Sequence, residues 1–236
     1  MKLSIIIPTF NEERTIIQVL DKIIKLDLRG VEKEIIVIDD GSIDSTVEKI
    51  KNMKYKNIIL ILHTRNQGKG AAVLSGIKKT TGDYIIVQDA DLEYDPKYIH
   101  KLLQPIIAGK AQVVYGTRLK RRPNIYKEEN NTLFFIHYFG NRFLSLVTSI
   151  LYGQWLTDME TGYKIFPKKI IAGMKLNSKS FDFEPEITAK LLKRKYYILE
   201  IPITTTPRGY DQGKKLNTIK DGIIALWTLL KYRFVD

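Results

Sequence analysis

Short apolar runs alternate with helical patterns through the first half of the chain, and few folds accommodate that alternation. Runs of strand length cover residues 3–7, 34–39, 58–62, 84–88 and 113–118. Segments with apolar residues at helical spacing lie between them, at residues 15–26, 44–53 and 68–80. Strands that are apolar throughout are typical of a parallel sheet buried on both faces. We therefore predict an α/β fold, with a Rossmann-like, mostly parallel sheet and helices on both faces.

Longer helical patterns dominate the second half of the chain, which has 236 residues in all. They cover residues 133–153, 183–195 and 218–234, and a strand pattern covers residues 196–203. No apolar run reaches the roughly 18 residues that a membrane-spanning helix needs. No signal peptide is visible, and the absence of cysteine excludes disulfides and thiolate metal sites. We expect a soluble or peripheral protein made in the cytoplasm.

The chain is strongly basic, with 38 Lys and Arg against 26 Asp and Glu and a formal net charge of +12. Such an excess favours anionic partners, namely nucleic acid, anionic lipid or phosphorylated substrates. Two dense basic clusters lie in the second half, at residues 118–123 and 190–197. A solvated surface is the plain alternative for both clusters.

Polar side chains follow each predicted strand, at the end where parallel sheets bind ligands. They are Pro8, Asn11 and Glu12, then Asp39 and Asp40, then Arg65, Gln67, Gly68 and Lys69, then Asp89 and Asp91, and finally Arg118. We expect them to face one crevice. Asp39 is suited to accept from a nucleobase or a ribose, and Lys69 stands at a helix start, where amides and lysine hold phosphate. The spacing is not that of a P-loop, and no Gly-x-Gly-x-x-Gly follows the first strand.

Asp89 and Asp91 flank one small residue, Ala90, at the end of the fourth strand. Because alternate side chains of a strand point the same way, we expect both carboxylates on one side, with Glu93 continuing the same parity. Hard oxygen donors suit Mg²⁺ or Mn²⁺, which would neutralise the repulsion between them and bridge to phosphates. The alternative is that these acidic residues cap the next helix, as we expect of Asp95.

The order of these motifs resembles glycosyltransferase family 2. The motifs are SIIIPTFNEE, VIDDGSIDST, NQGKGAAVLSG, QDADLEYDP and GTR, and they occupy about the first 120 residues. The nearer resemblance is to the dolichol-phosphate mannose synthases and other polyprenyl-phosphate sugar transferases. It extends through the second half in LTDMETGYKIFP, FDFEPEITAKLLKRKYYILEIPI and GKKLNTIKDGIIALWTLLKYRF.

The resemblance implies the A-type glycosyltransferase fold as a single catalytic domain over residues 1–236. Residues 1–118 would bind the nucleotide-sugar, and residues 119–236, with amphipathic helices, would bind the acceptor. The implied reaction is an inverting transfer of a hexose, from a donor of the GDP-mannose or UDP-glucose type to dolichyl or undecaprenyl phosphate.

The same resemblance implies roles for individual residues. The donor-binding set would be Pro8, Thr9, Glu12, Asp39, Asp40, Lys69, Ala90 and Arg208. The catalytic set would be Asp89 and Asp91 as a DxD pair for Mg²⁺ or Mn²⁺, Arg118 at the acceptor phosphate, and Asp158. The role of Glu93 as a further metal ligand, direct or through water, rests on residue parity alone, because the synthases have Gln at that position. They also have a Ser-Arg pair where His137 and Tyr138 stand, which leaves His137 or Arg142 to hold the acceptor phosphate.

Two other functions fit parts of the sequence. A family 2 transferase acting on a saccharide hydroxyl would need a base, for which Asp158 is the candidate, whereas a phosphate acceptor is already anionic. A structural hydrogen bond or a helix cap is the plain alternative for Asp158. A non-catalytic nucleotide- or nucleic-acid-binding module would use the basic charge, but acids at the strand ends would repel phosphates without a metal. We therefore predict no nucleic-acid partner.

A lipid-phosphate acceptor implies a membrane surface as partner. The helical patterns at residues 134–153 and 225–234 would lie in the interface, with Arg and Lys towards the head groups. Packing of both helices in the core is the alternative. We expect peripheral attachment to the cytoplasmic face of the cell membrane, and a separate membrane-protein partner remains open.

Overall fold

The computed structural model describes residues 1–53, 55, 57–119, 132–206 and 218–235. Seven strands form one sheet: β1 (Lys2–Thr9), β2 (Glu32–Asp39), β3 (Ile58–Leu62), β4 (Tyr84–Val87), β5 (Val113–Thr117), β6 (Lys164–Pro167) and β7 (Ile198–Pro202). Their order is β3-β2-β1-β4-β6-β5-β7. Only β6 runs against its neighbours, β4 and β5, and the other pairs are parallel. The carboxyl ends of the other six strands therefore point to the same edge of the sheet, and the predicted mostly parallel sheet is confirmed.

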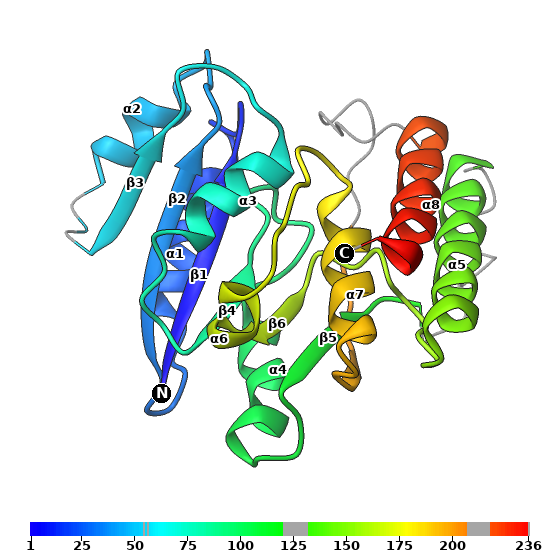
Figure 1. Cartoon of the computed structure of the whole chain (residues 1–236). Coiled ribbons are helices and arrows are strands. Elements are labelled where there is room, and N and C mark those ends of the chain that lie inside the picture. The colour runs from blue at the N-terminus through cyan, green and yellow to red at the C-terminus, as the bar shows by residue number, and fades with distance from the viewer. Residues whose placement is uncertain (54, 56, 120–131, 207–217, 236) are drawn as a thin grey trace.

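Helices cover both faces of the sheet (Figure 1). They are α1 (Ile16–Lys25), α2 (Thr46–Lys51), α3 (Lys69–Ile77), α4 (Lys97–Ile107), α5 (Thr132–Tyr152), α6 (Lys168–Ala172), α7 (Phe183–Lys193) and α8 (Thr218–Phe234). Successive residues of β1 belong to opposite cores. Ile6 lies in the core that also contains residues of α3, α7 and α8, whereas Ile5 and Ile7 lie in the core that contains residues of α1 and α4. This double burial explains why the strands are apolar throughout.

The predicted strands and helices are all present, with their ends moved by a few residues. The sequence patterns did not reveal α6 or β6. β6 has four residues, all buried, which is too short for a periodic pattern to identify.

α5 and α8 lie side by side at one end of the molecule (Figure 1). The Tyr152 hydroxyl donates to the carbonyl of Leu229 at 2.7 Å, and Leu144 and Ala225 are buried. Each helix thus packs one face in the core and exposes another. Within the described ranges, no helix combines the length and the apolarity needed to cross a bilayer.

Candidate active site

The carboxyl ends of β1, β2, β4 and β5 bring the predicted residues towards one edge of the sheet. β1 lies between β2 and β4, with Thr9 opposite Asp39 in the register. β5 is separated from β4 by the reversed strand β6. Arg118 nevertheless reaches back across that strand, because its guanidinium carbon lies 5.9 Å from the centre of the Tyr94 ring.

Asp39 is buried at the end of β2, with 2% of its surface exposed. Its Oδ2 accepts from the Ser42 N–H at 3.0 Å, whereas its Oδ1 is buried and has no hydrogen-bond partner among the described residues. Gly41 makes the tight turn, with φ +77, and a Cβ there would lie 2.6 Å from the backbone of Arg65. A buried carboxylate oxygen without a partner is costly, so this atom is suited to accept from a ligand.

Four other residues that were predicted to bind the nucleotide-sugar donor lie around this edge: Pro8, Thr9, Glu12 and Ala90. The Glu12 carboxylate accepts from the Thr15 hydroxyl at 2.9 Å, and Glu12 is 7% exposed. Thr9 and Ala90 are buried, and Pro8 is partly exposed. Thr9 and Ala90 thus support the edge from within, while the side chain of Pro8 reaches its surface.

Asp40 holds the turn that precedes α3. Its Oδ1 lies 2.7 Å from Nδ1 of His63 and accepts from the Gln67 N–H at 3.0 Å. Its Oδ2 accepts from the Gly68 N–H at 2.7 Å, and Nε2 of His63 lies 2.9 Å from the Ser75 hydroxyl. Because both carboxylate oxygens are engaged by the protein, the arrangement favours a positioning role for Asp40 over contact with a donor.

The start of α3 is covered by the loop at residues 178–180. Gly68 has φ +97, and a Cβ there would lie 2.2 Å from the carbonyl oxygen of Lys179. The Ala71 N–H donates to the same oxygen at 3.2 Å. The Ala71 N–H at the start of α3 is therefore hydrogen-bonded to a protein carbonyl and not left for a phosphate.

Lys69 forms two ion pairs that join three elements. Its Nζ lies 2.8 Å from Oδ1 of Asp89, which follows β4, and 3.0 Å from Oε1 of Glu184, in the first turn of α7. Burial lowers the pKa of Lys69, but the two carboxylates outweigh it and raise that pKa well above its ordinary value. The two carboxylates thus stabilise the charged form of Lys69.

The acidic turn after β4 differs from the strand geometry that we expected. β4 ends at Val87, and Leu92 has a left-handed φ of 67°. Strand alternation does not extend over residues 89–93, so the parity argument that placed Glu93 beside the pair is wrong. The Glu93 N–H donates to Oδ1 of Asp91 at 3.0 Å. In the part of the chain that the structure describes, no three His, Asp or Glu side chains cluster to hold a metal.

Hydrogen bonds from aromatic and amide side chains hold the acidic turn after β4 in place. Nε2 of Gln88 donates to the carbonyls of Asp89 and Tyr94, each at 3.0 Å, and its Oε1 accepts from the Tyr163 hydroxyl. The Tyr94 hydroxyl accepts from the Gly162 N–H at 2.9 Å, and burial raises the pKa of Tyr94 to about 12. A Cβ on Gly162 would lie 2.9 Å from Oδ2 of Asp89. Glycine thus lets the chain approach this carboxylate closely.

Arg118 and Asp158 form a two-pronged ion pair. Nε of Arg118 donates to Oδ2 at 2.8 Å and Nη2 donates to Oδ1 at 2.7 Å, while the Arg118 backbone N–H also donates to Oδ2. Asp158 is fully buried, and its own N–H donates to Glu200 at 3.0 Å. Such paired geometry fixes both side chains. The prediction brought these two residues to the site separately, and the structure joins them.

Three charged residues lie next to these groups and were not predicted from the sequence: the partly exposed Glu160 and the buried Lys164 and Glu184. Oε1 of Glu160 and Oε2 of Glu184 are buried without a hydrogen-bond partner among the described residues. Burial raises the pKa of Glu160 to about 8, and burial lowers the pKa of Lys164 to about 8. Nζ of Lys164 donates to the carbonyls of Met159 and Thr161 and so holds the loop after Asp158.

Arg208 lies outside the described residues. The Thr206 N–H donates to the carbonyl of Glu93 at 3.0 Å, and Tyr94 pairs with Thr205 in an isolated bridge. Thr205 and Thr206 therefore lie beside the acidic turn.

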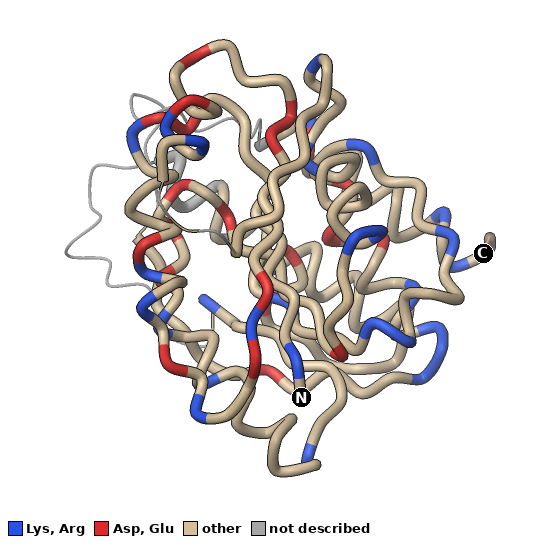
Figure 2. Tube along the Cα trace, turned by 90° about the vertical axis from the view of Figure 1, so that its left-hand side faces the viewer, with Lys and Arg blue, Asp and Glu red and all other residues tan. Residues whose placement is uncertain are grey.

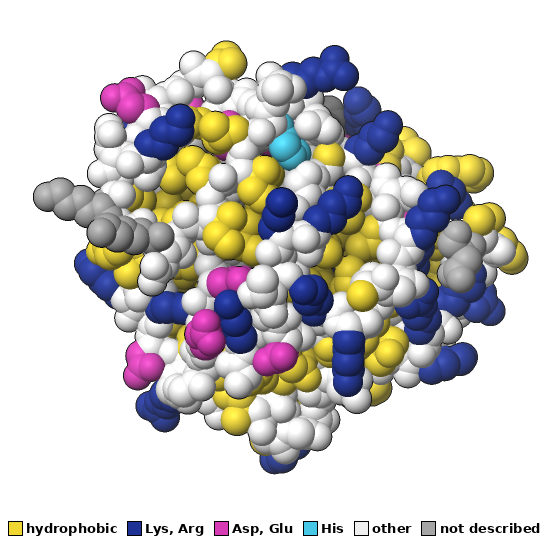
Figure 3. Space-filling view, turned by 60° about the vertical axis from the view of Figure 1, so that its left-hand side comes forward, with side chains coloured by type: hydrophobic (Ala, Val, Ile, Leu, Met, Phe, Trp, Pro, Cys, Tyr) yellow, Lys and Arg dark blue, Asp and Glu magenta, His cyan; other side chains and the backbone are white. Residues whose placement is uncertain are grey.

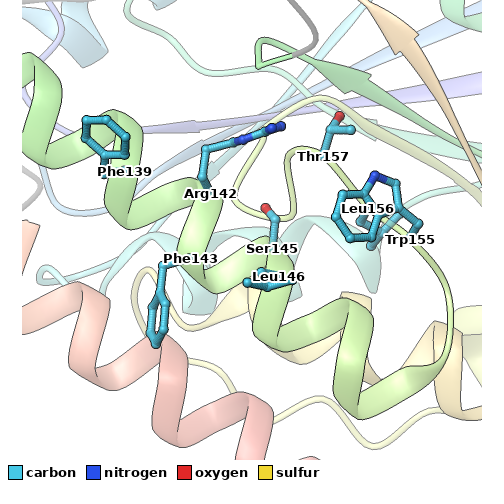
Figure 4. A pocket seen from close by; sticks show the side chains of 8 residues that line it. All are labelled: Phe139, Arg142, Phe143, Ser145, Leu146, Trp155, Leu156 and Thr157. Carbon is cyan, nitrogen blue, oxygen red and sulfur yellow. The ribbon is translucent and has the colours of Figure 1, made fainter.

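A cavity of about 430 Å³ lies between α5 and the segment that precedes Asp158. It is lined by Phe139, Arg142, Phe143, Ser145, Leu146, Trp155, Leu156 and Thr157. Figure 4 shows Arg142 extending from α5 in the direction of Thr157. The Thr157 hydroxyl lies 2.7 Å from that of Thr117, the residue before Arg118. The mostly apolar cavity thus ends beside the Arg118–Asp158 pair, and Arg142, unlike His137, is among its lining residues.

Residues 4–172 match the sequence profile of glycosyl transferase family 2, which covers well over half of the chain. The chain belongs to glycosyl transferase family 2. It is therefore a glycosyltransferase.

Two relatives are similar over nearly the whole chain. A dolichol-phosphate mannosyltransferase of Pyrococcus furiosus is 30% identical over 240 residues, covering 98% of this chain, and this chain spans 64% of that protein's length. A UDP-N-acetylglucosamine–dolichyl-phosphate N-acetylglucosaminyltransferase of Methanococcus voltae is 30% identical over 234 residues, covering 91% of this chain and 90% of its own.

The fold is similar to that of a solved protein structure. Glucosyl-3-phosphoglycerate synthase from Mycobacterium tuberculosis, in complex with Mn²⁺ and UDP-glucose, superposes with a TM-score of 0.75 at 20% identity, over 100% of this chain and 80% of that one. This likeness confirms the A-type glycosyltransferase fold.

Proposed function

We propose that this family 2 enzyme is an inverting, metal-dependent transferase that moves a hexose from a nucleotide-sugar donor, of the GDP-mannose or UDP-glucose type, to a polyprenyl phosphate. The observation that carries the proposal is the position of the α5 cavity, whose apolar wall ends beside the Arg118–Asp158 pair. Arg118 in turn contacts the acidic turn through Tyr94. A polyprenyl phosphate fits this arrangement, because its apolar tail would occupy the cavity and its anionic phosphate would lie at Arg118, next to the donor diphosphate. The two relatives named for transfer to dolichyl phosphate support the same acceptor class.

On the donor side, we assign the unpartnered Oδ1 of Asp39 to a hydrogen bond from the nucleobase or the ribose. Pro8 and Glu12 would contact the nucleoside from β1, and Asp40 would hold the turn beside it. The assignment follows from burial: an acceptor with no protein donor is most stable when a ligand supplies one.

Asp89 and Asp91 fit a divalent metal ion. Mg²⁺ in proteins is typically held by one or two carboxylates together with substrate phosphates, so the pair is sufficient without Glu93. Asp89 already attracts a cation, because the Lys69 ammonium lies 2.8 Å from its Oδ1. When bound, the ion would supply electrostatic stabilisation of the leaving nucleoside diphosphate. The similar M. tuberculosis synthase, which binds Mn²⁺ with UDP-glucose, supports the same metal class.

On the acceptor side, we assign the acceptor phosphate to Arg118 and Arg142. The fork to Asp158 uses Nε and Nη2 of Arg118, so the guanidinium can face the phosphate with Nη1. Arg142 lines the cavity from α5. Two guanidinium groups neutralise an anionic head while the apolar lining holds the first units of the chain.

The alternative acceptor, a saccharide hydroxyl, requires a general base. Asp158 is the candidate, but both of its oxygens accept from Arg118 and its side chain is fully buried. A carboxylate held in that way would have to break the fork to take a proton. A phosphate acceptor needs no such step, so the geometry favours it.

An exposed apolar face on α5 and α8 supports attachment to a membrane surface. It consists of Phe139, Phe143, Leu146, Ile150 and Trp155 together with Ile219, Ile223, Trp227, Leu230 and Phe234, all more than a third exposed. Figure 2 shows several Lys and Arg residues near the C-terminal end of the chain, and Figure 3 shows Lys and Arg side chains interspersed with hydrophobic ones on the face that it draws. Apolar and basic groups together suit an anionic lipid surface. We place the enzyme peripherally on the cytoplasmic face of the cell membrane.

Calorimetry of donor binding tests the donor half of the proposal. UDP-sugars and GDP-mannose are titrated into the protein with Mn²⁺ or with EDTA. We expect one donor to bind with Mn²⁺ only, and Asp91→Ala to weaken that binding by roughly tenfold or more. Asp95→Ala is the matched control, because Asp95 caps α4 through the Lys97 N–H and should leave donor binding unchanged. Metal-independent binding of the donor would contradict the proposed site.

A further inference from the structure

The ion pairs of Lys69 place a fixed positive charge where a metal ion is expected. Its Nζ contacts Asp89 at 2.8 Å and Glu184 at 3.0 Å, and the side chains of Lys69 and Asp89 are each 18% exposed. A free ion and the ammonium would therefore meet at the same carboxylate.

The surroundings keep Lys69 in this position. Glu184 is buried, its Oε2 has no hydrogen-bond partner among the described residues, and its Oε1 pairs with the Lys69 ammonium. On the other side of Asp89, Gly162 approaches so closely that a Cβ would lie 2.9 Å from Oδ2. Removing the ammonium would leave the buried Glu184 and the partly exposed Asp89 without this ion pair, which is unfavourable.

We propose that Lys69 is the resident cation of the Asp89 site and competes with the metal ion, so that metal and donor diphosphate must bind together. Lys69, Asp89, Glu184 and Asp91 carry a net charge of −2, which one divalent ion would neutralise only in close contact with the ammonium. The negative diphosphate relieves that repulsion by lying between the two cations. The inference rests on the proposed function only in taking Asp89 as a metal ligand.

Titration of Mn²⁺ into nucleotide-free protein tests the competition directly. We expect weak binding to wild type and binding tighter by roughly tenfold or more to Lys69→Gln, which removes the charge and keeps a polar side chain. Lys69→Arg keeps the charge and should stay as weak as wild type. Lys97→Gln is the matched control, because Lys97 forms an ion pair with Asp95 outside the site and should not change Mn²⁺ binding.

A further variant covers the case in which Lys69→Gln does not fold, as judged by its thermal unfolding. Glu184→Gln removes negative charge and leaves Lys69 to Asp89 alone, so Mn²⁺ binding should weaken. The proposal is overturned if Lys69→Gln binds Mn²⁺ no tighter than wild type, if Lys69→Arg gains as much affinity, or if Glu184→Gln gains affinity. UDP and GDP titrations in the presence of Mn²⁺ are scored separately, so a failure to bind nucleotide would count against the proposed function and not against this comparison.

Discussion

At the scale of single residues, the pKa of a carboxylate depends on whether hydrogen-bond donors outweigh the effect of burial. Burial raises the pKa of Glu34, but hydrogen bonds from Ser4, Thr81 and Gly82 outweigh it and lower that pKa to about 2. Glu160 has a buried oxygen without a partner among the described residues, and burial raises its pKa to about 8. The difference lies in donors from distant segments, which no local pattern displays.

The depressed pKa of Glu34 predicts a pH dependence of stability. Its folded pKa of about 2 lies below the ordinary value of 4.5, so its contribution is complete above pH 4.5 and is lost as the pH falls towards 2. Glu34→Gln should lower the free energy of unfolding by about 2 kcal/mol at pH 7. Urea denaturation at pH 7 and pH 3 measures it, and the gap between wild type and variant should shrink at pH 3. An unchanged gap would show that the carboxylate charge does not matter.

The predictable site residues are those that follow strands directly. Asp39, Asp89 and Arg118 could be placed because a parallel sheet gathers its carboxyl ends. Glu184 and Glu160 could not, because an acidic residue in a helix or loop gives no sign in the sequence that its side chain will be buried. The Arg118–Asp158 ion pair joins residues 40 positions apart in the chain. Nothing in the sequence around either residue predicts that the two side chains pair.

At the scale of elements, continuous apolar strands were predictable because both faces of the sheet are covered. The same reasoning failed just beyond β4, where the strand ends two residues before Asp89 and alternation no longer holds. β6 was not predicted because the strand has only four residues and, unlike the other strands, pairs antiparallel with its neighbours.

The contact between the start of α3 and the 178–180 loop predicts that substitution of Gly68 destabilises the protein. Gly68→Ala combines a φ of +97 with a Cβ placed 2.2 Å from a backbone oxygen, so it should destabilise the protein by about 2 kcal/mol or more. Gly109→Ala is the matched control, since φ is +67 there but nothing lies within 4 Å of the added Cβ. Thermal unfolding compares the two. Equal losses of stability would show that the loop yields and does not hold the start of α3.

At the scale of the whole molecule, the net charge and the apolar face together predict lipid binding. The exposed side chains of α5 and α8 provide apolar area, and the basic residues near the C-terminus provide attraction to anionic lipid (Figure 2). The amphipathic patterns of both helices were visible in the sequence. Which of their faces stays exposed was not, because that depends on how α5 packs against α8.

Flotation with anionic vesicles tests this surface. Wild type should float with the vesicles, and the bound fraction should fall as salt rises, because surface charges are screened. Trp227→Glu, at a residue 66% exposed, should reduce binding by roughly tenfold. Ile107→Glu is the control, an exposed apolar residue on α4 away from this face. Equal effects of the two substitutions would rule out a docking role for the α5 and α8 face.

The central claim is transfer of a hexose from a nucleotide donor to a polyprenyl phosphate, and a lipid-extraction assay with labelled donors measures it most directly. Labelled UDP-glucose, UDP-N-acetylglucosamine and GDP-mannose are each incubated with the enzyme, Mn²⁺ and vesicles carrying polyprenyl phosphate. We predict that one labelled sugar enters the lipid phase, and that EDTA, omission of the polyprenyl phosphate, or Asp91→Ala each abolishes the transfer. Transfer to a soluble saccharide with no labelled lipid would contradict this claim. It would favour the alternative reaction, in which Asp158 acts as the general base.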